Sequence, residues 1–178
     1  MDDATDAERW SRAAHGDGEA FGQVFDRHRD RVLRHSLRLV PNWHDAEEVV
    51  ALTFLEAWRK RERVRFVEGS VLPWLLVTAT NVSRNLSRSA RRHRALLDKL
   101  PPPTDREVDV DDSAVAALRG LPLNDRQVLT LSVLEGFSEA EVAEALGVPR
   151  GTVKSRLSRA KKKLAISLAP QLHERTSS

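Results

Sequence analysis

The sequence predicts an all-α protein in which two small helical domains are joined by a flexible acidic linker. Apolar residues recur at helical spacing along most of the chain, and no stretch alternates apolar and polar residues between turn signals. The proline triplet at 101–103 interrupts this spacing and opens an acidic stretch that has little to bury. We therefore expect a first domain over residues 1–99, a linker over 100–112 and a second domain, containing a helix-turn-helix, over 113–178.

The first domain is expected to contain three helices. PNW at 41–43 separates the first two, and the second begins at Asp45 with acids in its first turn and bases in its last, as the helix dipole favours. Pro73 suits the first turn of the third helix. The expected ranges are about 17–39, 45–61 and 74–97.

Capping signals define the helices of the second domain. Asn124 followed by Gln127 resembles a capping box that opens a helix running through residue 134. Ser138 and Glu141 form a second capping box, and Gly147 ends the helix that it opens. Pro149 then introduces a basic final helix, and the chain ends about ten residues beyond it, so no further C-terminal domain is expected.

The composition narrows the kind of protein. The 178 residues suffice for two small domains, and the absence of cysteine excludes disulfides and fits a reducing cytoplasm. The longest purely apolar run, at 71–77, is too short to cross a bilayer, so no membrane insertion is expected. The acidic, polar start of the chain is unlike a signal peptide. We therefore expect a cytoplasmic protein.

Charge is distributed in blocks rather than evenly. Residues 81–99 carry a net charge of +5 and residues 150–163 a net charge of +7, whereas residues 101–112 between them carry −4. Two basic blocks separated by an acidic spacer indicate two surfaces for a polyanion. The alternative is that each block is an ordinary solvated face.

The final helix has the pattern of a duplex reader. Val153, Leu157, Ala160 and Leu164 form the expected buried stripe, and small polar and basic residues lie opposite. Small side chains allow close approach to a major groove, while Arg and Lys reach base edges and phosphates. The preceding helix and short turn have the spacing of a helix-turn-helix, with a non-binding helical hairpin as the alternative.

The third helix of the first domain repeats this design. Asn81 and four arginines lie opposite an apolar stripe, and no acid occurs between Gly69 and residue 97 to pair with them. An amide and several cations on one face can serve base edges and phosphates. The alternative is a solubilising arginine face. The second helix differs, because acids and leucines share its remaining faces, which favours a protein-docking surface or packing of those leucines within the domain.

No catalytic constellation is visible. The six histidines are scattered without metal-site spacing, and no phosphate-binding glycine loop is present. We therefore expect no enzymatic activity, no metal and no cofactor.

Two long stretches resemble a known family. DAEEVVALTFLEAWRKR followed by LPWLLVTATNVSRNLSRSARR resembles region two of bacterial RNA polymerase sigma factors of the extracytoplasmic-function group. LRGLPLNDRQVLTLSVLEGFSEAEVAEALGVPRGTVKSRLSRAKKKL resembles their region four. The resemblance covers about residues 21–164, and the two motifs in this order around a linker are specific to the family.

The resemblance implies a sigma factor that binds core RNA polymerase and directs it to promoter DNA, with an anti-sigma factor as a further candidate partner. It implies polymerase contacts from Asp45, Glu48, Leu52, Leu55 and Glu56. The minus-ten element would be recognised and melted by Asn81, Arg84, Asn85, Arg88, Arg91 and Arg92. The loop at 68–72 would help to hold a flipped base. The minus-thirty-five element would be read by Arg150, Thr152, Lys154, Ser155, Ser158, Arg159 and Lys162.

Two positions depart from the family pattern. Ala51-Leu52 stands where many members carry Gln followed by an acid, and Ser70-Val71-Leu72 stands where aromatics are common in the base-pocket loop. Two other functions fit parts of the pattern. One is a stand-alone helix-turn-helix regulator whose N-terminal helical domain dimerises or senses a signal, and the other is a helical adaptor that binds only proteins.

Overall fold

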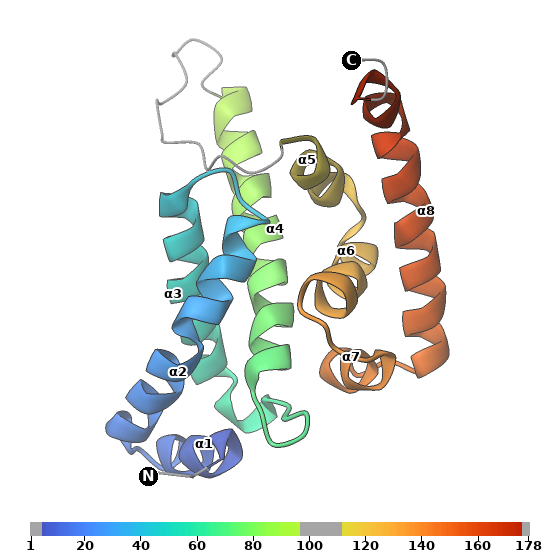
Figure 1. The fold of residues 1–178 in the computed structure, drawn as a ribbon. Helices are drawn as coiled ribbons and strands as arrows, with labels where there is room; N and C mark the ends of the chain where they lie inside the picture. Colours follow the sequence, from blue (N-terminus) through green and yellow to red (C-terminus); the bar gives the residue numbers. More distant parts are fainter. Residues whose placement is uncertain (1–4, 97–111, 176–178) are drawn as a thin grey trace. The chain divides into compact units, whose positions relative to one another are not determined.

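The computed structural model describes residues 5–96 and 112–175, with side chains over 5–89 and 113–169. The chain divides into two compact units, Met1–Val108 and Asp109–Ser178. Apart from an isolated bridge between Val67 and Ser70, every regular element in the described residues is helical, which confirms the predicted all-α class (Figure 1). The predicted linker over 100–112 lies outside the described residues, except for Asp112, where a helix begins.

The first unit is a helical bundle in which α2, α3 and α4 pack against one another and α1 packs on α2. Its core is formed by aliphatic side chains such as Val24, Val49 and Leu75, none of which is exposed to solvent. Polar pairs are buried in this unit as well, for example His35 and Thr80, whose Nε2 and Oγ1 atoms lie 2.9 Å apart. The helices, in chain order, are α1 (Asp6–Ala14), α2 (Gly18–Leu37), α3 (Trp43–Arg59), the short 3₁₀ turn η1 (Arg61–Arg63) and α4 (Leu72–Leu96).

The three predicted helices of this unit are confirmed, with small changes at their ends. Asp17 caps α2, its carboxylate accepting from the Ala20 amide. Asn42 caps α3 by accepting from the Asp45 amide at 2.7 Å, so this helix begins two residues before the predicted start. Helix α1 was missed by the prediction, although Thr5 and Glu8 form a complete capping box at its start.

The described residues of the second unit, 112–175, form four helices and one π-helical turn. Helix α8 packs against α5, α6 and α7, and Val128, Val142 and Val153 are fully buried in the resulting core. The elements, in chain order, are α5 (Asp112–Gly120), α6 (Leu123–Leu129), the π-helical turn η2 (Thr130–Leu134), α7 (Glu139–Leu146) and α8 (Arg150–Arg175).

The predicted helix-turn-helix is present in this unit. Ser138 and Glu141 make both bonds of the predicted capping box, and Gly147 ends α7 with a left-handed backbone at φ 65°. The Val148 amide donates back to the Ala143 carbonyl at 3.0 Å, which is the longer bond of a Schellman motif. Pro149 follows, and α8 begins at the next residue, as expected.

Two predictions for this unit are wrong. Asn124 and Gln127 form no capping box, because Pro122 is the N-cap of α6 and Asn124 lies inside the first turn, while Gln127 is buried. Helix α8 also runs to Arg175, about two turns further than expected. The residues AISLA at 165–169 continue it because Ala and Leu favour helix strongly.

Candidate nucleic-acid interface

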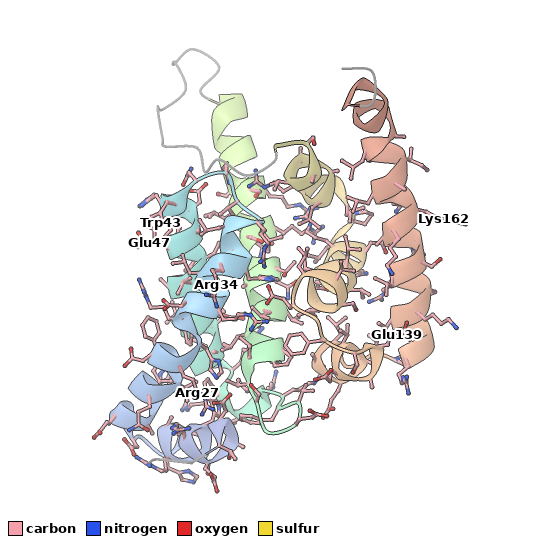
Figure 2. The ribbon with its side chains drawn as sticks, viewed as in Figure 1. Arg27, Arg34, Trp43, Glu47, Glu139 and Lys162 are labelled. Carbon is pink, nitrogen blue, oxygen red and sulfur yellow. The ribbon has the colours of Figure 1, made fainter. Side chains whose placement is uncertain are left out.

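The outer side of α8 carries most of the residues predicted to read duplex DNA. Lys162 projects away from α6 and α7 (Figure 2) and is exposed. Val153 and Ala160, on the opposite side, are fully buried, so packing fixes which side of α8 faces outward. Thr152 is half-buried, and its carbonyl accepts from the Ser155 hydroxyl at 3.0 Å. The exposed members of the predicted set are Arg150, Lys154, Ser155, Ser158, Arg159 and Lys162.

Arg159 has a partner that sequence reasoning missed. Its Nε and Nη2 donate to the carboxylate of Asp125 on α6 at 3.1–3.3 Å, and Lys163 Nζ donates to the same carboxylate at 3.0 Å. Asp125 is 2% exposed, whereas the Arg159 side chain is 55% exposed. The Arg159 guanidinium is therefore held along one edge, and its Nη1 takes no part in these bonds.

The same cluster sets the ionisation of Asp125. Burial raises the pKa of this carboxyl, but the hydrogen bonds and positive charge of Arg159 and Lys163 outweigh burial and hold the pKa below its ordinary value. Asp125 is thus a carboxylate at neutral pH, and it neutralises part of the basic surface of α8 from beneath.

Helix α4 also separates into a buried and an outer side. Leu75, Ala79 and Ser83 are fully buried against the bundle. Among the predicted minus-ten residues, Asn81 and Arg84 are half-buried, and Asn85 and Arg88 are exposed. Arg91 and Arg92 belong to α4, but their side chains lie outside the described residues. The described part of the outer side of α4 therefore carries two amides, Asn81 and Asn85, and two arginines, Arg84 and Arg88.

The loop before α4 is a tight, well-bonded turn. Val67 and Ser70 exchange two backbone hydrogen bonds of 2.9 and 3.0 Å. The two residues between them, Glu68 and Gly69, have φ of 49° and 78°, the positive values of a type I′ turn. Both are exposed, whereas Val71 at the start of α4 is fully buried. The tip of the turn is thus exposed to solvent, while the residues that flank it, Val67 and Val71, are buried.

Asp6, a residue that sequence analysis did not single out, bonds to the C-terminal end of this turn, where it joins α4. Its Oδ2 accepts from the Ser70 hydroxyl and the Val71 amide, each at 3.0 Å, and lies 2.6 Å from His28 Nε2. Burial raises the pKa of Asp6. The hydrogen bond and charge of His28, together with the donors Ser70 and Val71, outweigh burial and lower the pKa to about 2. No local sequence signal links Asp6 to partners 22 and 64 residues away.

The predicted polymerase-binding residues lie on α3. Leu52 and Leu55 are 37% and 47% exposed, Glu48 is exposed, and Asp45 is half-buried. Glu56 pairs with Lys60 at 2.6 Å. The leucines are therefore not buried within their own unit, which was the alternative left open by the sequence.

Leu55 also lines an apolar groove. It has a volume of about 430 Å³, and aromatic rings from α2 and α3 form much of its wall. The rings brace one another, with the Phe25 and Phe54 centroids 4.7 Å apart and those of Phe21 and Trp58 5.1 Å apart. The lining residues are Gly18, Phe21, Phe25, Ala51, Phe54, Leu55 and Trp58.

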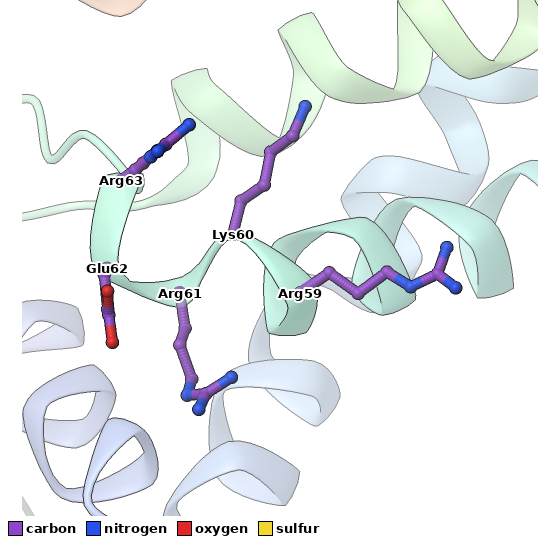
Figure 3. Close-up of a pocket in the computed structure, with 5 residues that line it drawn as sticks. All are labelled: Arg59, Lys60, Arg61, Glu62 and Arg63. Atoms are coloured by element: carbon purple, nitrogen blue, oxygen red, sulfur yellow. The ribbon is translucent and has the colours of Figure 1, made fainter.

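A basic turn follows α3, and sequence reasoning did not assign it a role. A cavity of about 240 Å³ is lined by four basic residues and one acid of this turn: Arg59, Lys60, Arg61, Arg63 and Glu62. Lys60 and Arg63 point to one side of the turn and Arg61 to the other (Figure 3). Arg61 is braced, with its guanidinium carbon 5.1 Å from the centre of the Trp58 ring.

The described residues contain neither a metal-binding cluster nor a helix suited to cross a membrane. No group of three His, Cys, Asp or Glu side chains is placed to share a metal ion over the described residues. None of the helices in the same residues has the length and apolar character needed to span a membrane.

Comparison with known proteins connects both units to one family. The family model for sigma-70 region 2 matches residues 24–93, and that for sigma-70 region 4 matches residues 112–164. The ECF RNA polymerase sigma factor SigM of Mycobacterium tuberculosis is 32% identical over 164 residues, covering 90% of this chain and 83% of SigM. SigL of the same species is 32% identical over 168 residues, covering 90% of this chain and 95% of SigL.

Solved structures agree with this assignment. CnrH, solved in complex with the cytosolic domain of CnrY, is 26% identical with a TM-score of 0.64, covering 93% of this chain and 97% of CnrH. The sigma factor RpoE of Bartonella quintana, solved with the anti-sigma factor NepR, is 26% identical with a TM-score of 0.56, covering 84% of this chain and 96% of RpoE. The chain therefore belongs to the extracytoplasmic-function (ECF) group of RNA polymerase sigma factors.

Proposed function

We propose that this chain is a non-enzymatic specificity subunit that binds core RNA polymerase and places two basic helices on promoter DNA. The observation that carries the proposal is the pair of outward basic faces, on α4 in the region-two unit and on α8 in the region-four unit. Such a subunit acts where the polymerase and chromosome are, so we assign it to the cytoplasm.

The α3 surface is the proposed polymerase contact. Exposed leucines beside an aromatic-lined groove offer apolar area that a partner helix can bury, and Glu48 supplies negative charge at its edge. Leu52 also occupies one of the two positions where many family members carry Gln and an acid. The contact of this chain is therefore proposed to be more apolar there than in those members.

The two DNA contacts have different tasks in this proposal. The α8 face reads the minus-thirty-five element as intact duplex, because small exposed side chains at Ser155 and Ser158 let the helix approach base edges. The α4 face and the turn at 67–70 engage the minus-ten element, where strands separate and a base is extruded at a cost of about a few kcal/mol. Both contacts neutralise phosphates, so promoter binding should weaken steeply with salt.

We also propose that an anti-sigma factor regulates this chain. The support is that the similar solved structures of CnrH and RpoE are both complexes, the latter with a named anti-sigma factor.

Reconstituted transcription tests the proposed function. Purified chain and core RNA polymerase, supplied with promoter fragments selected from a genomic library, should yield permanganate-reactive thymines at the minus-ten element only when both proteins are present. Failure to open any selected promoter would refute the proposal. Tight binding to a palindromic duplex without polymerase would instead favour a stand-alone helix-turn-helix regulator.

A further inference from the structure

We propose that Asp6, at the start of α1, is a positioning residue for minus-ten recognition because it locks the turn at 67–70 onto the bundle. This inference rests on the proposed function, in which that turn helps to hold an extruded base. Nothing in the family match supports it directly, because the region 2 model begins at residue 24, well after α1.

The contacts of Asp6 converge on the C-terminal end of the turn, at Ser70 and Val71. One carboxylate oxygen, Oδ2, receives the Ser70 hydroxyl and the Val71 amide from the turn and faces Nε2 of His28 on α2. The other oxygen, Oδ1, lies 3.5 Å from Arg27 Nη1, and Figure 2 marks Arg27 on α2. Three segments of the unit, α1, α2 and the turn, are therefore joined by one side chain.

The serine continues the chain of bonds into α4. Ser70 Oγ donates to Asp6 and accepts from the Leu72 amide at 3.2 Å, so the same hydroxyl caps the start of α4. The exposed tip, Glu68 and Gly69, is separated from this anchor only by the two bonds between Val67 and Ser70. These bonds therefore limit how far the turn can move relative to α4.

The burial of Asp6 argues for a positional role. The residue is 4% exposed, and burying a carboxylate carries a desolvation cost. The buried apolar side chains of Trp10 and Ala13 hold α1 on the bundle without that cost. The carboxylate adds a geometric constraint, because its hydrogen bonds form only when the Ser70 and Val71 donors lie at the right distance and angle. A pocket fixed in advance avoids the ordering cost that a loose loop pays when it captures a base.

The test uses the full chain in holoenzyme with Asp6→Ala, and Asp17→Ala as the matched control. Asp17 is also an acid at the α1–α2 junction, where it caps α2 and pairs with Arg12 of α1, but no bond links it to the turn. The substrates are fork-junction promoters carrying each of the four bases at the extruded position, with 2-aminopurine beside it to report extrusion.

We expect Asp6→Ala to reduce discrimination among the four bases by about fivefold or more, as loss of one or two charge-assisted hydrogen bonds allows. Binding to core polymerase should stay unchanged, amide hydrogen exchange at Val71 should accelerate, and Asp17→Ala should keep wild-type discrimination. If Asp6→Ala does not fold, Ser70→Ala decides, because it removes one bond to the carboxylate while leaving Asp6 buried; it should lower discrimination in the same direction by a smaller factor.

Wild-type discrimination in a folded Asp6→Ala or Ser70→Ala holoenzyme would overturn the inference, as would an equal loss in Asp17→Ala. A wild-type holoenzyme that opens no promoter would overturn the proposed function, and the inference with it. The two failures are therefore separate in the same experiment.

Discussion

Replacing Asp125 with alanine should separate the stability of the second unit from its DNA specificity. The carboxylate receives four hydrogen bonds, two of them shared by Arg159 Nε, from two cationic side chains, which are 55% and 44% exposed. Bonds to ionised groups contribute about 1.5–3 kcal/mol when well buried, but exposed ion pairs only about 0.2–1 kcal/mol. Because the cations are screened by solvent, we expect a loss of about 1–2 kcal/mol in the free energy of unfolding.

The effect on DNA follows from the edge at which Arg159 is held. With Nε and one hydrogen of Nη2 directed at Asp125, the end of the guanidinium keeps the two-donor geometry that fits guanine O6 and N7. Without the carboxylate the side chain gains rotamers and loses that direction. Discrimination at the base it reads should fall by about 1–2 kcal/mol, a large part of the value of a bidentate contact.

Non-specific binding should change in the opposite sense. Removing one negative charge from beneath the α8 face frees Arg159 and Lys163 for phosphates, so affinity for unrelated DNA should rise and the salt dependence should steepen by about one unit. Holoenzyme binding to cognate and substituted minus-thirty-five elements, measured by anisotropy at several salt concentrations, gives both quantities. Glu144→Ala, which removes an exposed charge from α7, is the matched control.

Two outcomes would refute this reasoning. Unchanged discrimination with Asp125→Ala would mean that the carboxylate does not orient Arg159 for base reading. An equal loss on every sequence would mean that Asp125 acts through stability alone. Arg159→Ala in the same assay should cost about 1–3 kcal/mol at one base pair if it reads a base, and the same on all sequences if it touches only phosphate.

Three other changes test other parts of the structure. Leu55→Asp places a charge beside the α3 groove and should weaken binding to core polymerase by about 2 kcal/mol without lowering the melting temperature, because Leu55 is already 47% exposed; unchanged affinity in a pull-down titration would exclude this surface. Ser138→Ala removes the cap of α7 and should lower the free energy of unfolding by about 1 kcal/mol in urea titration, and a neutral result would show that the capping box contributes nothing. The pKa of Asp6, lowered from 3.8 to about 2, means that its carboxylate adds stability above about pH 4 that is lost as pH falls toward about 2, amounting to about 2 kcal/mol. Denaturation of wild type and Asp6→Ala across that range should show their difference in stability shrinking as pH falls, and a constant difference would contradict the assigned pKa.

Local signals allowed much of the fold to be predicted. The α7–α8 hairpin follows from Ser138, Glu141 and Gly147, whose effects act within one turn of helix. Helix α1 is different, because its nine residues are too few to be stable alone and depend on distant partners. The Trp10 indole, for example, donates to the Arg61 carbonyl, 51 residues away.

The same distinction applies to the candidate site. Helical spacing correctly predicted which side of α8 faces outward, because burial of Val153 and Ala160 follows from period alone. It could not predict that Arg159 is held by Asp125, which is 34 residues away and on another helix. The Asn124–Gln127 capping box is wrong for a related reason: a pattern that fits two positions gives no sign that Pro122 already occupies the cap.

If the turn at 67–70 engages the minus-ten element as proposed, its backbone geometry bears on how promoter preference can diverge among paralogues. Glu68 holds a positive φ of 49°, a backbone conformation that costs a non-glycine residue about 1 kcal/mol, so asparagine or glycine would fit there with less strain. The Glu68 side chain takes no part in the anchoring bonds made by Ser70 and Val71, and Gly69 has no side chain. Under the proposed function, a substitution at the tip would therefore alter the chemistry presented to DNA and leave these anchoring bonds in place. Under the proposed function, a set of such proteins in one bacterium could diverge at Glu68 without changes to the helical bundle, whereas the φ of 78° at Gly69 disfavours residues other than glycine there.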